Sequence, residues 1–427
     1  MSEPAPSAPA LPARWRLLTI LTASYGAGAF GMLGISPLSP SLVEGFGLTR
    51  LQVAFLVPSI YLAGLLFSLP GGRLADRLGV RPAFLGGLAV GAIGLLAAAL
   101  APGFLAFLFC LFVAGSGWSV VNPALGKAII DAFPIRERGI AMGVKQMGLT
   151  LGGLVAALVL PAIAAALGWR YAIGACSVIV AVPVALGWRP LAAFRTGARG
   201  APVPAGAADA GSTWWWARRP ALVIFFGAGF VLGMVQGAVL SYLPLFTIQA
   251  LGFDKIGAGF LVAASQAGGA VSRLVLGAAS DRWAAGRRSL WLAFTGAVGA
   301  GIFLAYAVWP ASSAGLAGLL AFAAGVGAYG WVGIFFVISA EAGGRGQAGL
   351  LSGVAFASIV LGLLVGPPIF GLLLEGSDSY AVAWAVYAAL SGLVALVSLL
   401  AGPAIDRESH RGQVLHSDIS TRCDVGM

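Results

Sequence analysis

The sequence predicts an all-α membrane protein with about twelve transmembrane helices, arranged as two halves of six. The chain of 427 residues is 59% hydrophobic and 9% charged, with a mean hydropathy of +0.95. A water-soluble core could not bury so much apolar surface. About twelve apolar segments are long enough to cross the hydrocarbon of a bilayer, which is about 30 Å thick and takes about 20 residues. An internal repeat divides these segments into two equal sets.

The segments follow one another with short connections. In the first half they lie near 15–37, 51–71, 82–102, 104–130, 139–166 and 171–188. In the second half they lie near 220–246, 256–278, 289–309, 314–338, 348–373 and 380–402. The 63 glycines favour close helix packing within a membrane, where small side chains let backbones approach.

The repeat is visible as identical residues at constant offsets. Seven residues of the first half return 205 positions later without a gap: Gly47, Phe55, Leu56, Gly64, Gly72, Asp76 and Arg77 match Gly252, Phe260, Leu261, Gly269, Gly277, Asp281 and Arg282. Further along the offset is 210, which pairs Gly115, Gly117, Gly139, Gly143 and Gly152 with Gly325, Gly327, Gly349, Gly353 and Gly362. Internal symmetry of this kind is typical of transporters that rock one half against the other around a substrate at the midplane.

Three segments lie outside the two six-helix bundles expected at 14–188 and 220–402. Residues 1–13 are rich in Pro, Ala and Ser and are expected to be disordered. Residues 189–219 form a polar linker that ends in three tryptophans and two arginines, a pattern typical of an interfacial anchor. Residues 403–427 form a tail. The first apolar segment is too long for a signal peptide and has no cleavage site, so it is expected to remain as a span.

The basic residues predict the orientation of the chain. Of 25 Lys and Arg residues, 20 fall on one side of the predicted membrane, whereas Arg50, Arg170 and Lys255 fall on the other. By the positive-inside rule, both termini are cytoplasmic, and we expect the protein in the cytoplasmic (inner) membrane of a bacterium. The net charge of +10 indicates contact with anionic lipid rather than nucleic acid, because no basic cluster is interleaved with aromatics in a soluble domain. The three cysteines and two histidines predict neither a metal site nor a disulfide framework.

A charged loop joins the second and third predicted spans. It holds Gly72, the pair Asp76-Arg77, Gly79 and Arg81. This pattern resembles the loop signature of the major facilitator superfamily, and the resemblance extends over nearly the whole chain. It implies two six-helix bundles around a central cavity that opens to each side in turn.

The resemblance also implies a gating role for the charged loops. The carboxylate of Asp76, with Arg77 and Arg81 beside it, would face the start of the eleventh span, where free N–H groups and the helix dipole favour an anion. The repeat assigns the same role to Asp281 and Arg282 against the start of the fifth span. The alternative interpretation is a solvated charged turn.

The interior of the predicted spans holds two cations and no acid or histidine. Lys145 follows Arg138 by seven residues and so lies about 10 Å into the fifth span, and Arg273 precedes Asp281 by eight residues and lies about 12 Å into the eighth. An ionisable side chain at membrane depth is costly and indicates a functional site. Both positions indicate a cavity that binds a negative charge.

Arg273 lies in a pattern with Gly277, Asp281 and Arg282 that resembles monocarboxylate and other organic-anion carriers, in which the matching arginine binds the substrate carboxylate. Arginine suits this role because its planar fork offers two parallel donors. Those carriers usually place an aspartate one turn before the arginine, where this chain has Gly269, so proton symport by an Asp–Arg pair is in doubt. The alternative for Arg273 is a role at the cytoplasmic end of the helix, and for Lys145 it is snorkelling to the interface.

Further polar and aromatic residues are candidates for contact with the substrate. They have equally ordinary structural explanations as helix ties or packing. These residues are Gln146, Tyr25, Asn122, Gln236, Gln266, Tyr329 and Trp331.

We therefore predict a secondary active transporter that moves a small organic anion, most simply a carboxylate, by alternating access, with Arg273 and Lys145 as charge partners of the substrate. The coupling partner would be a proton or a counter-anion. A proton-driven drug or metabolite efflux antiporter is the alternative, but it would normally need a membrane carboxylate. A transporter-like sensor is a third hypothesis, which the short tails disfavour. Enzyme activity and cofactors have no support, and we expect a monomer.

Overall fold

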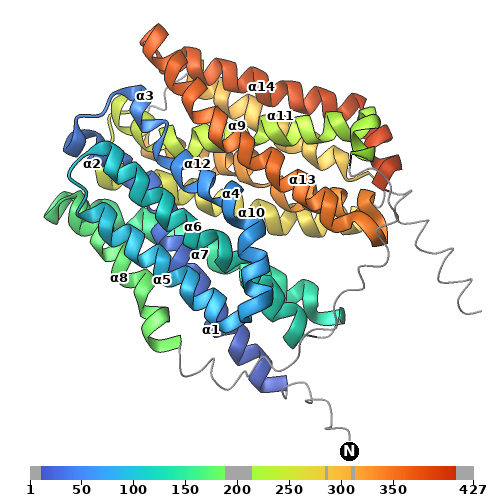
Figure 1. Ribbon diagram of the computed structural model, residues 1–427. Coiled ribbons are helices and arrows are strands. Elements are labelled where there is room, and N and C mark those ends of the chain that lie inside the picture. Colours follow the sequence, from blue (N-terminus) through green and yellow to red (C-terminus); the bar gives the residue numbers. More distant parts are fainter. Residues whose placement is uncertain (1–10, 134, 188–213, 284–286, 309–312, 410–427) are drawn as a thin grey trace, which may run out of the picture. The chain divides into compact units, whose positions relative to one another are not determined.

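The computed structural model describes residues 11–133, 135–187, 214–283, 287–308 and 313–409. These residues fold into helices joined by short connections (Figure 1). The helices of the first half are α1 Leu11–Leu33, α2 Ile35–Phe46, α3 Arg50–Val53, α4 Leu56–Leu78, α5 Val80–Ala99, α6 Phe104–Ala132, α7 Ile135–Leu167 and α8 Trp169–Gly187. Those that follow are η2 Trp215–Arg218, α9 Pro220–Gln249, α10 Lys255–Trp283, α11 Ser289–Val308, α12 Ala314–Tyr329, α13 Val332–Ser377 and α14 Tyr380–Leu400.

Within the described residues, twelve helical segments are long and apolar enough to cross a membrane, which confirms the predicted fold class. Four of these spans join or divide the helices above. The first runs through α1 and α2, and the second joins α3 to the start of α4. The tenth joins α12 to the start of α13 and ends at Gly344, and the eleventh is the part of α13 from Gly349 to Ser377. The division of α13 falls at Gly344, whose φ of 56° and ψ of −161° interrupt the helix. The predicted break between spans ten and eleven therefore coincides with a glycine in a conformation that other residues rarely adopt.

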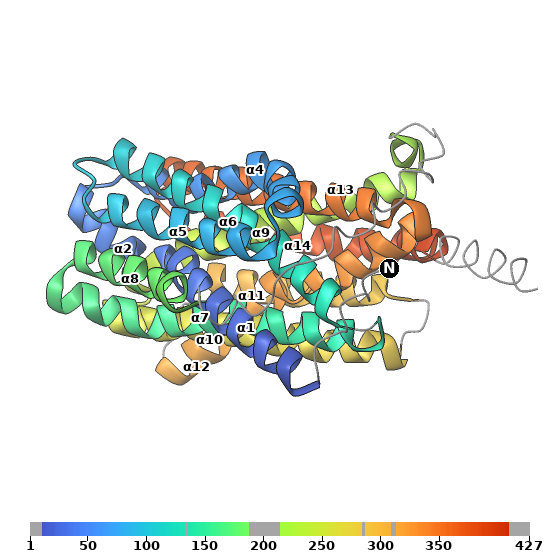
Figure 2. The same ribbon diagram turned by 60° about the horizontal axis from the view of Figure 1, so that its bottom comes forward.

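The helices cluster into two compact units. One contains residues 1–203 with 253–263, and the other contains 204–252 with 264–427. In the first unit α1 packs on α7, and α5 packs on both α6 and α8, as the two views of the ribbon show (Figures 1 and 2). In the second unit α9 packs on α13, and α11 packs on both α12 and α14.

The sequence repeat reappears as matching helix crossings within the two units. A side-chain carbon added at Gly115 of α6 would collide with the carbonyl of Ile60 in α4. A carbon added at Gly325 of α12 would collide in the same way with the carbonyl of Ser265 in α10. The glycines are 210 positions apart and the carbonyls are 205 apart, which are the two offsets of the sequence repeat. Each unit thus uses a glycine at the same place to bring two backbones into contact.

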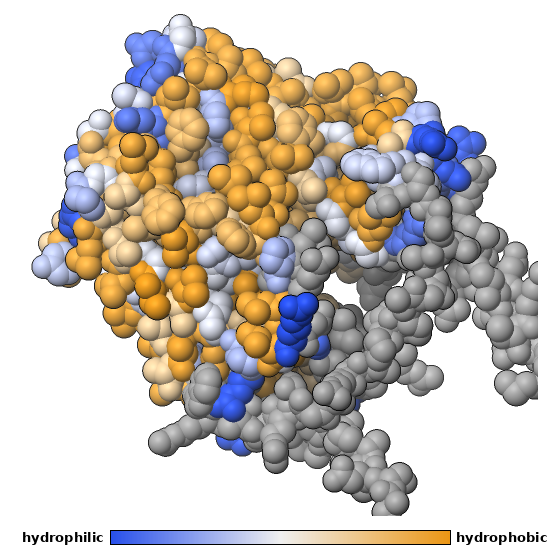
Figure 3. Space-filling model, in the orientation of Figure 1, coloured by the Kyte–Doolittle hydropathy of each residue, from blue (hydrophilic) through white to orange (hydrophobic). Residues whose placement is uncertain are grey.

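Large apolar side chains remain exposed along the helices of both units. Leu66, Leu105 and Ile93 of the first unit and Leu319 and Leu372 of the second are each more than half exposed. Hydrophobic residues cover most of the visible described surface in Figure 3, and hydrophilic ones gather at its margins. Exposed leucine and isoleucine in such numbers fit lipid rather than water as the solvent of this surface.

A polar cluster fastens the chain that follows α14 to the second unit. The carboxylate of Asp406 accepts hydrogen bonds from the backbone N–H of Ser289, at 3.1 Å, and from its hydroxyl, at 2.6 Å. Asp406 thereby caps the first turn of α11. Arg219, ahead of α9, forms an ion pair with Glu408 at 2.7 Å. The start of the predicted tail is therefore ordered as far as residue 409, and residues 410–427 lie outside the described residues.

Candidate functional site

Lys145 lies on α7 and is buried, with 7% of its surface exposed. Its ammonium donates a hydrogen bond to Oδ1 of Asn122 on α6. The same nitrogen lies 5.3 Å from the centre of the Tyr25 ring on α1, within the range of a cation–π interaction. Tyr25 in turn stacks on Trp118 of α6, with ring centres 4.8 Å apart and planes at 10°. Three helices of the first unit thus surround one cation with an amide oxygen and an aromatic face.

Close helix crossings produce this cluster. A carbon added at Gly148 would lie 2.5 Å from the carbonyl oxygen of Thr22, so α7 and α1 touch backbone to backbone one turn from Lys145. A carbon added at Gly28 would lie 2.6 Å from the Trp118 ring, which occupies the space that the missing side chain leaves. Glycines at these two positions therefore place Tyr25 between Lys145 and Trp118.

The environment of Lys145 leaves its charge incompletely compensated. An ammonium has three donors, and here one of them reaches a neutral amide. Among the residues described in the structure, none places a carboxylate within ion-pair distance of Lys145. Burying a cation without a counter-charge is costly, and an anionic ligand would supply that charge. The Lys145 ammonium is held by Asn122 and Tyr25; whether it lines a cavity or snorkels to the interface stays a prediction.

Arg273 occupies a different environment in the second unit. It is partly buried on α10, and its Nε donates a hydrogen bond to the backbone oxygen of Tyr329, at the end of α12, at 3.0 Å. This bond helps to fix the plane of the guanidinium, a planar group with five donors. An arginine oriented in this way is suited to bidentate contact with a carboxylate.

The residue one turn before Arg273 is Gly269, where the monocarboxylate carriers usually have an aspartate. A carbon added at Gly269 would lie 2.7 Å from the ring of Tyr329. The Tyr329 side chain, which is itself buried, fills the volume that an aspartate would need. The glycine and the tyrosine therefore replace the carboxylate on which a proton-coupled pair would depend.

The remaining candidate residues have varied surroundings. Gln146 is exposed, whereas Gln266 is buried. Gln236 is partly buried on α9, and its Oε1 is a buried acceptor with no hydrogen-bond partner among the described residues. Trp331 is fully buried, where its Nε1 donates to the carbonyl of Ala328 at 2.9 Å and its ring packs against Phe335. Trp331 therefore belongs to the packing of the second unit.

The gating residues are only partly described. Arg77 is exposed and Arg81 is half-buried. The side chains of Asp76, Asp281 and Arg282 lie outside the described residues. The latch between these carboxylates and the facing helix starts stays a prediction.

Sequence reasoning missed Trp118 as part of the Lys145 cluster. Trp118 precedes Asn122 by four residues, and residues four apart share one face of a helix. That spacing on α6 was the available signal.

In the described part of the chain, no three His, Cys, Asp or Glu residues are grouped as metal ligands would be.

Comparison with known proteins identifies the family. The family model described as the Major Facilitator Superfamily matches residues 19–359. A probable sulfoacetate transporter of Cupriavidus necator is 26% identical over 95% of this chain and 98% of that protein. The 3-(3-hydroxy-phenyl)propionate transporter of Escherichia coli is 27% identical over 56% of this chain and 59% of that protein.

The fold agrees with this assignment. The crystal structure of a bacterial homologue of the human lysosomal transporter Spinster superposes with a TM-score of 0.73 at 18% identity, covering 94% of this chain and 98% of that one. The matched family segment runs from the first span into the eleventh of the twelve candidate spans in the described residues. The chain therefore belongs to the Major Facilitator Superfamily and is a membrane transporter.

Proposed function

We propose that the protein is a secondary active carrier of a small organic anion, with Lys145 and Arg273 as the residues that attract its negative group. One observation carries the proposal: Lys145 is buried at membrane depth with an amide and an aromatic ring as partners, and no described carboxylate neutralises it. Such a cation is costly unless a ligand completes its environment.

The class of ligand follows from the partners of the two cations. A carboxylate or sulfonate offers oxygen acceptors to an ammonium and to a guanidinium fork. The aromatic surface of Tyr25 and Trp118 beside Lys145 would contact the organic body of such a molecule. The relatives named for sulfoacetate and for 3-(3-hydroxy-phenyl)propionate support this class, because both molecules are organic anions at neutral pH.

The energy source for transport follows from the positions of the acidic residues. Sequence places the acids in loops, termini or helix ends, and Gly269 with Tyr329 occupies the position of the missing aspartate. Coupling would then come from exchange of one anion for another, from a co-transported ion, or from a proton carried by the substrate. We place the protein in the bacterial cytoplasmic membrane with both termini on the cytoplasmic side, on the strength of its charge distribution.

Transport by the purified protein in liposomes tests the proposal. The panel should contain radiolabelled monocarboxylates, dicarboxylates and sulfonates, with a permanently cationic drug as the opposite charge class. We expect uptake of at least one organic anion that is accelerated by unlabelled anion inside the vesicle, and no uptake of the cation. Robust proton-driven transport of the cationic drug, without transport of any anion, would overturn the proposal.

A further inference from the structure

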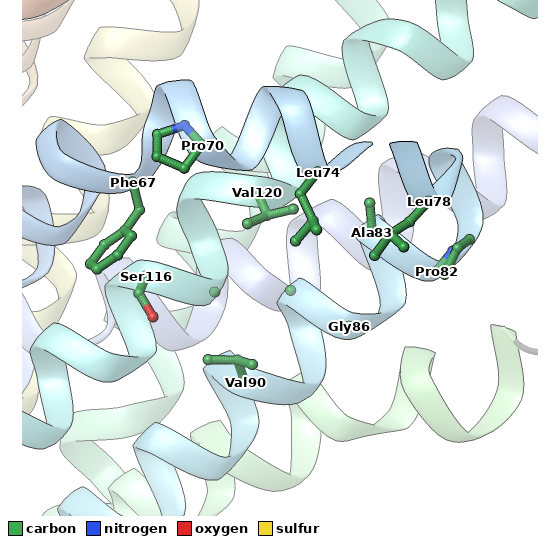
Figure 4. Close-up of a pocket in the computed structure, with 12 residues that line it drawn as sticks. Phe67, Pro70, Leu74, Leu78, Pro82, Ala83, Gly86, Val90, Ser116 and Val120 are labelled. Carbon is green, nitrogen blue, oxygen red and sulfur yellow. The ribbon is translucent and has the colours of Figure 1, made fainter. Parts of the chain in front are cut away.

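An apolar groove lies on the surface of the first unit, between α4, α5 and α6, and its lining shares no residue with the Lys145 cluster. Its volume is about 460 Å³. Phe67, Leu74 and Leu78 of α4 form one wall, and Val90 of α5 and Val120 of α6 lie across from them (Figure 4). Four of these side chains, Phe67, Leu74, Leu78 and Val90, are between 39% and 54% exposed, so the groove is open along its length.

Small residues hollow out the floor of the groove. A carbon added at Gly87 would lie 2.7 Å from the carbonyl oxygen of Gly117, so α5 and α6 are in tight contact there. One residue earlier, a carbon added at Gly86 would meet no atom within 4 Å, because Gly86 faces the groove. Ser116 is the polar side chain drawn in Figure 4, and its hydroxyl already donates to the carbonyl of Val113 at 2.7 Å. The groove therefore favours an apolar occupant.

The groove leads toward the charged loop. Phe67 and Leu78 mark its two ends on α4 (Figure 4), and the eleven helical steps between them span about 16 Å at 1.5 Å per residue. Phe67 ends the second candidate membrane span, Arg50–Phe67, and Leu78 lies beyond Gly72, where the charged loop begins. The groove therefore runs from the membrane span to the charged loop, as an acyl chain runs to its headgroup.

One end of the groove lies beside the charged loop. Leu78 and Pro82 lie together at this end (Figure 4), and each directly follows an arginine, Arg77 or Arg81. Arg77 is exposed and Arg81 is half-buried. The positive-inside rule assigns this loop to the cytoplasmic face, whose lipids carry negative headgroups.

We propose that the groove binds one acyl chain of an anionic phospholipid of the cytoplasmic leaflet, with the lipid phosphate at Arg77 and Arg81. The apolar wall holds the chain, the open floor at Gly86 accommodates it, and the two arginines select the anionic headgroup. The bound lipid then fills the groove where α4 and α5 meet the charged loop. This site is independent of the substrate and of the proposed anion transport.

Native mass spectrometry of the delipidated protein tests the site, with phosphatidylglycerol as the anionic probe and phosphatidylcholine as the zwitterionic one. Gly86→Phe places a ring in the open space and should weaken binding of phosphatidylglycerol about tenfold, the factor expected when about two methylene groups lose their burial. Arg77→Gln should weaken phosphatidylglycerol binding and leave phosphatidylcholine binding unchanged.

A matched substitution separates this effect from a general loss of fold. Gly301 on α11 is also exposed and also has open space where a side chain would lie, so Gly301→Phe should bind phosphatidylglycerol like the wild type. Gly86→Leu provides a second, smaller filling if Gly86→Phe fails to fold. Wild-type lipid binding in both Gly86 variants would overturn the proposal. Equal losses in the Gly301 variant, or equal affinities for the two lipids, would overturn it as well.

Discussion

Replacing Lys145 by methionine separates a ligand-binding lysine from a structural one, because the two roles predict opposite signs of stability change. Methionine keeps the length of the side chain and removes its charge. The lysine bonds to Asn122 and lies over the Tyr25 ring. A hydrogen bond from a charged group contributes about 1.5–3 kcal/mol, so loss of the ammonium should weaken anion binding about 10- to 150-fold.

The same substitution should leave the folded protein as stable as the wild type, or more stable. A cation at membrane depth costs about 2.5–3.5 kcal/mol on insertion scales, and methionine removes that cost. Asn122 is exposed, so its amide oxygen is not left buried without a partner when the lysine is gone. Anion binding measured by calorimetry and the melting temperature in the same detergent provide both readouts.

Lys255→Met is the matched control. Lys255 forms an ion pair with Glu44 and its side chain is 29% exposed, so this change should alter neither readout by more than about 0.5 kcal/mol. A Lys145→Met protein that melts earlier while binding anions normally would show that Lys145 ties α7 to α6. The proposal that it attracts the substrate would then be wrong.

Lys145 also bears on energy coupling, since arginine stays protonated and lysine can exchange a proton. We expect Lys145→Gln to abolish both pH-driven uptake and exchange of substrate for substrate, because both need the anion to bind. If only pH-driven uptake is lost, Lys145 is instead the proton carrier. If both activities survive, coupling depends on the substrate or on another ion.

Three further predictions concern other parts of the chain. Arg273→Lys keeps the charge but loses the planar fork, so the affinity for the anion should fall by about 1.5–3 kcal/mol in equilibrium binding; unchanged affinity would assign Arg273 a structural role. Asp76→Asn should shift the protein toward the inward-open state by about 0.3–2 kcal/mol, seen as faster labelling of inward-facing cysteines, and an unshifted labelling rate would contradict the latch. Gly115→Leu should destabilise the protein by about 1–3 kcal/mol because its side chain would overlap the Ile60 carbonyl, whereas Gly301→Leu enters open space and should change the unfolding free energy by less than about 0.5 kcal/mol.

The number and order of the membrane spans could be predicted from the sequence because hydropathy acts locally. Each span can be recognised from a run of about 20 apolar residues, independently of the rest of the chain. The internal repeat could also be recognised from the sequence. Its two offsets, 205 and 210 residues, reappear in the helix crossings at Gly115 and Gly325. The depth of Lys145 and Arg273 followed from their distance along a helix to the charged loops.

The partners of those two cations depended on the tertiary structure. The sequence left Lys145 between a ligand-binding role and snorkelling, and it did not show that Tyr25, Trp118 and Asn122 would lie against it. These residues meet because α1, α6 and α7 cross at particular rotations.

Glycines set those rotations. The sequence shows where Gly28 and Gly148 are, but not which backbone or ring each of them admits. Likewise, the sequence showed that an aspartate is missing at Gly269, and the structure shows that the ring of Tyr329 occupies its place. Hydropathy thus determined what lies in the membrane, whereas the packing of small residues between helices decided which polar side chains meet there, because that packing depends on contacts between residues far apart in the chain.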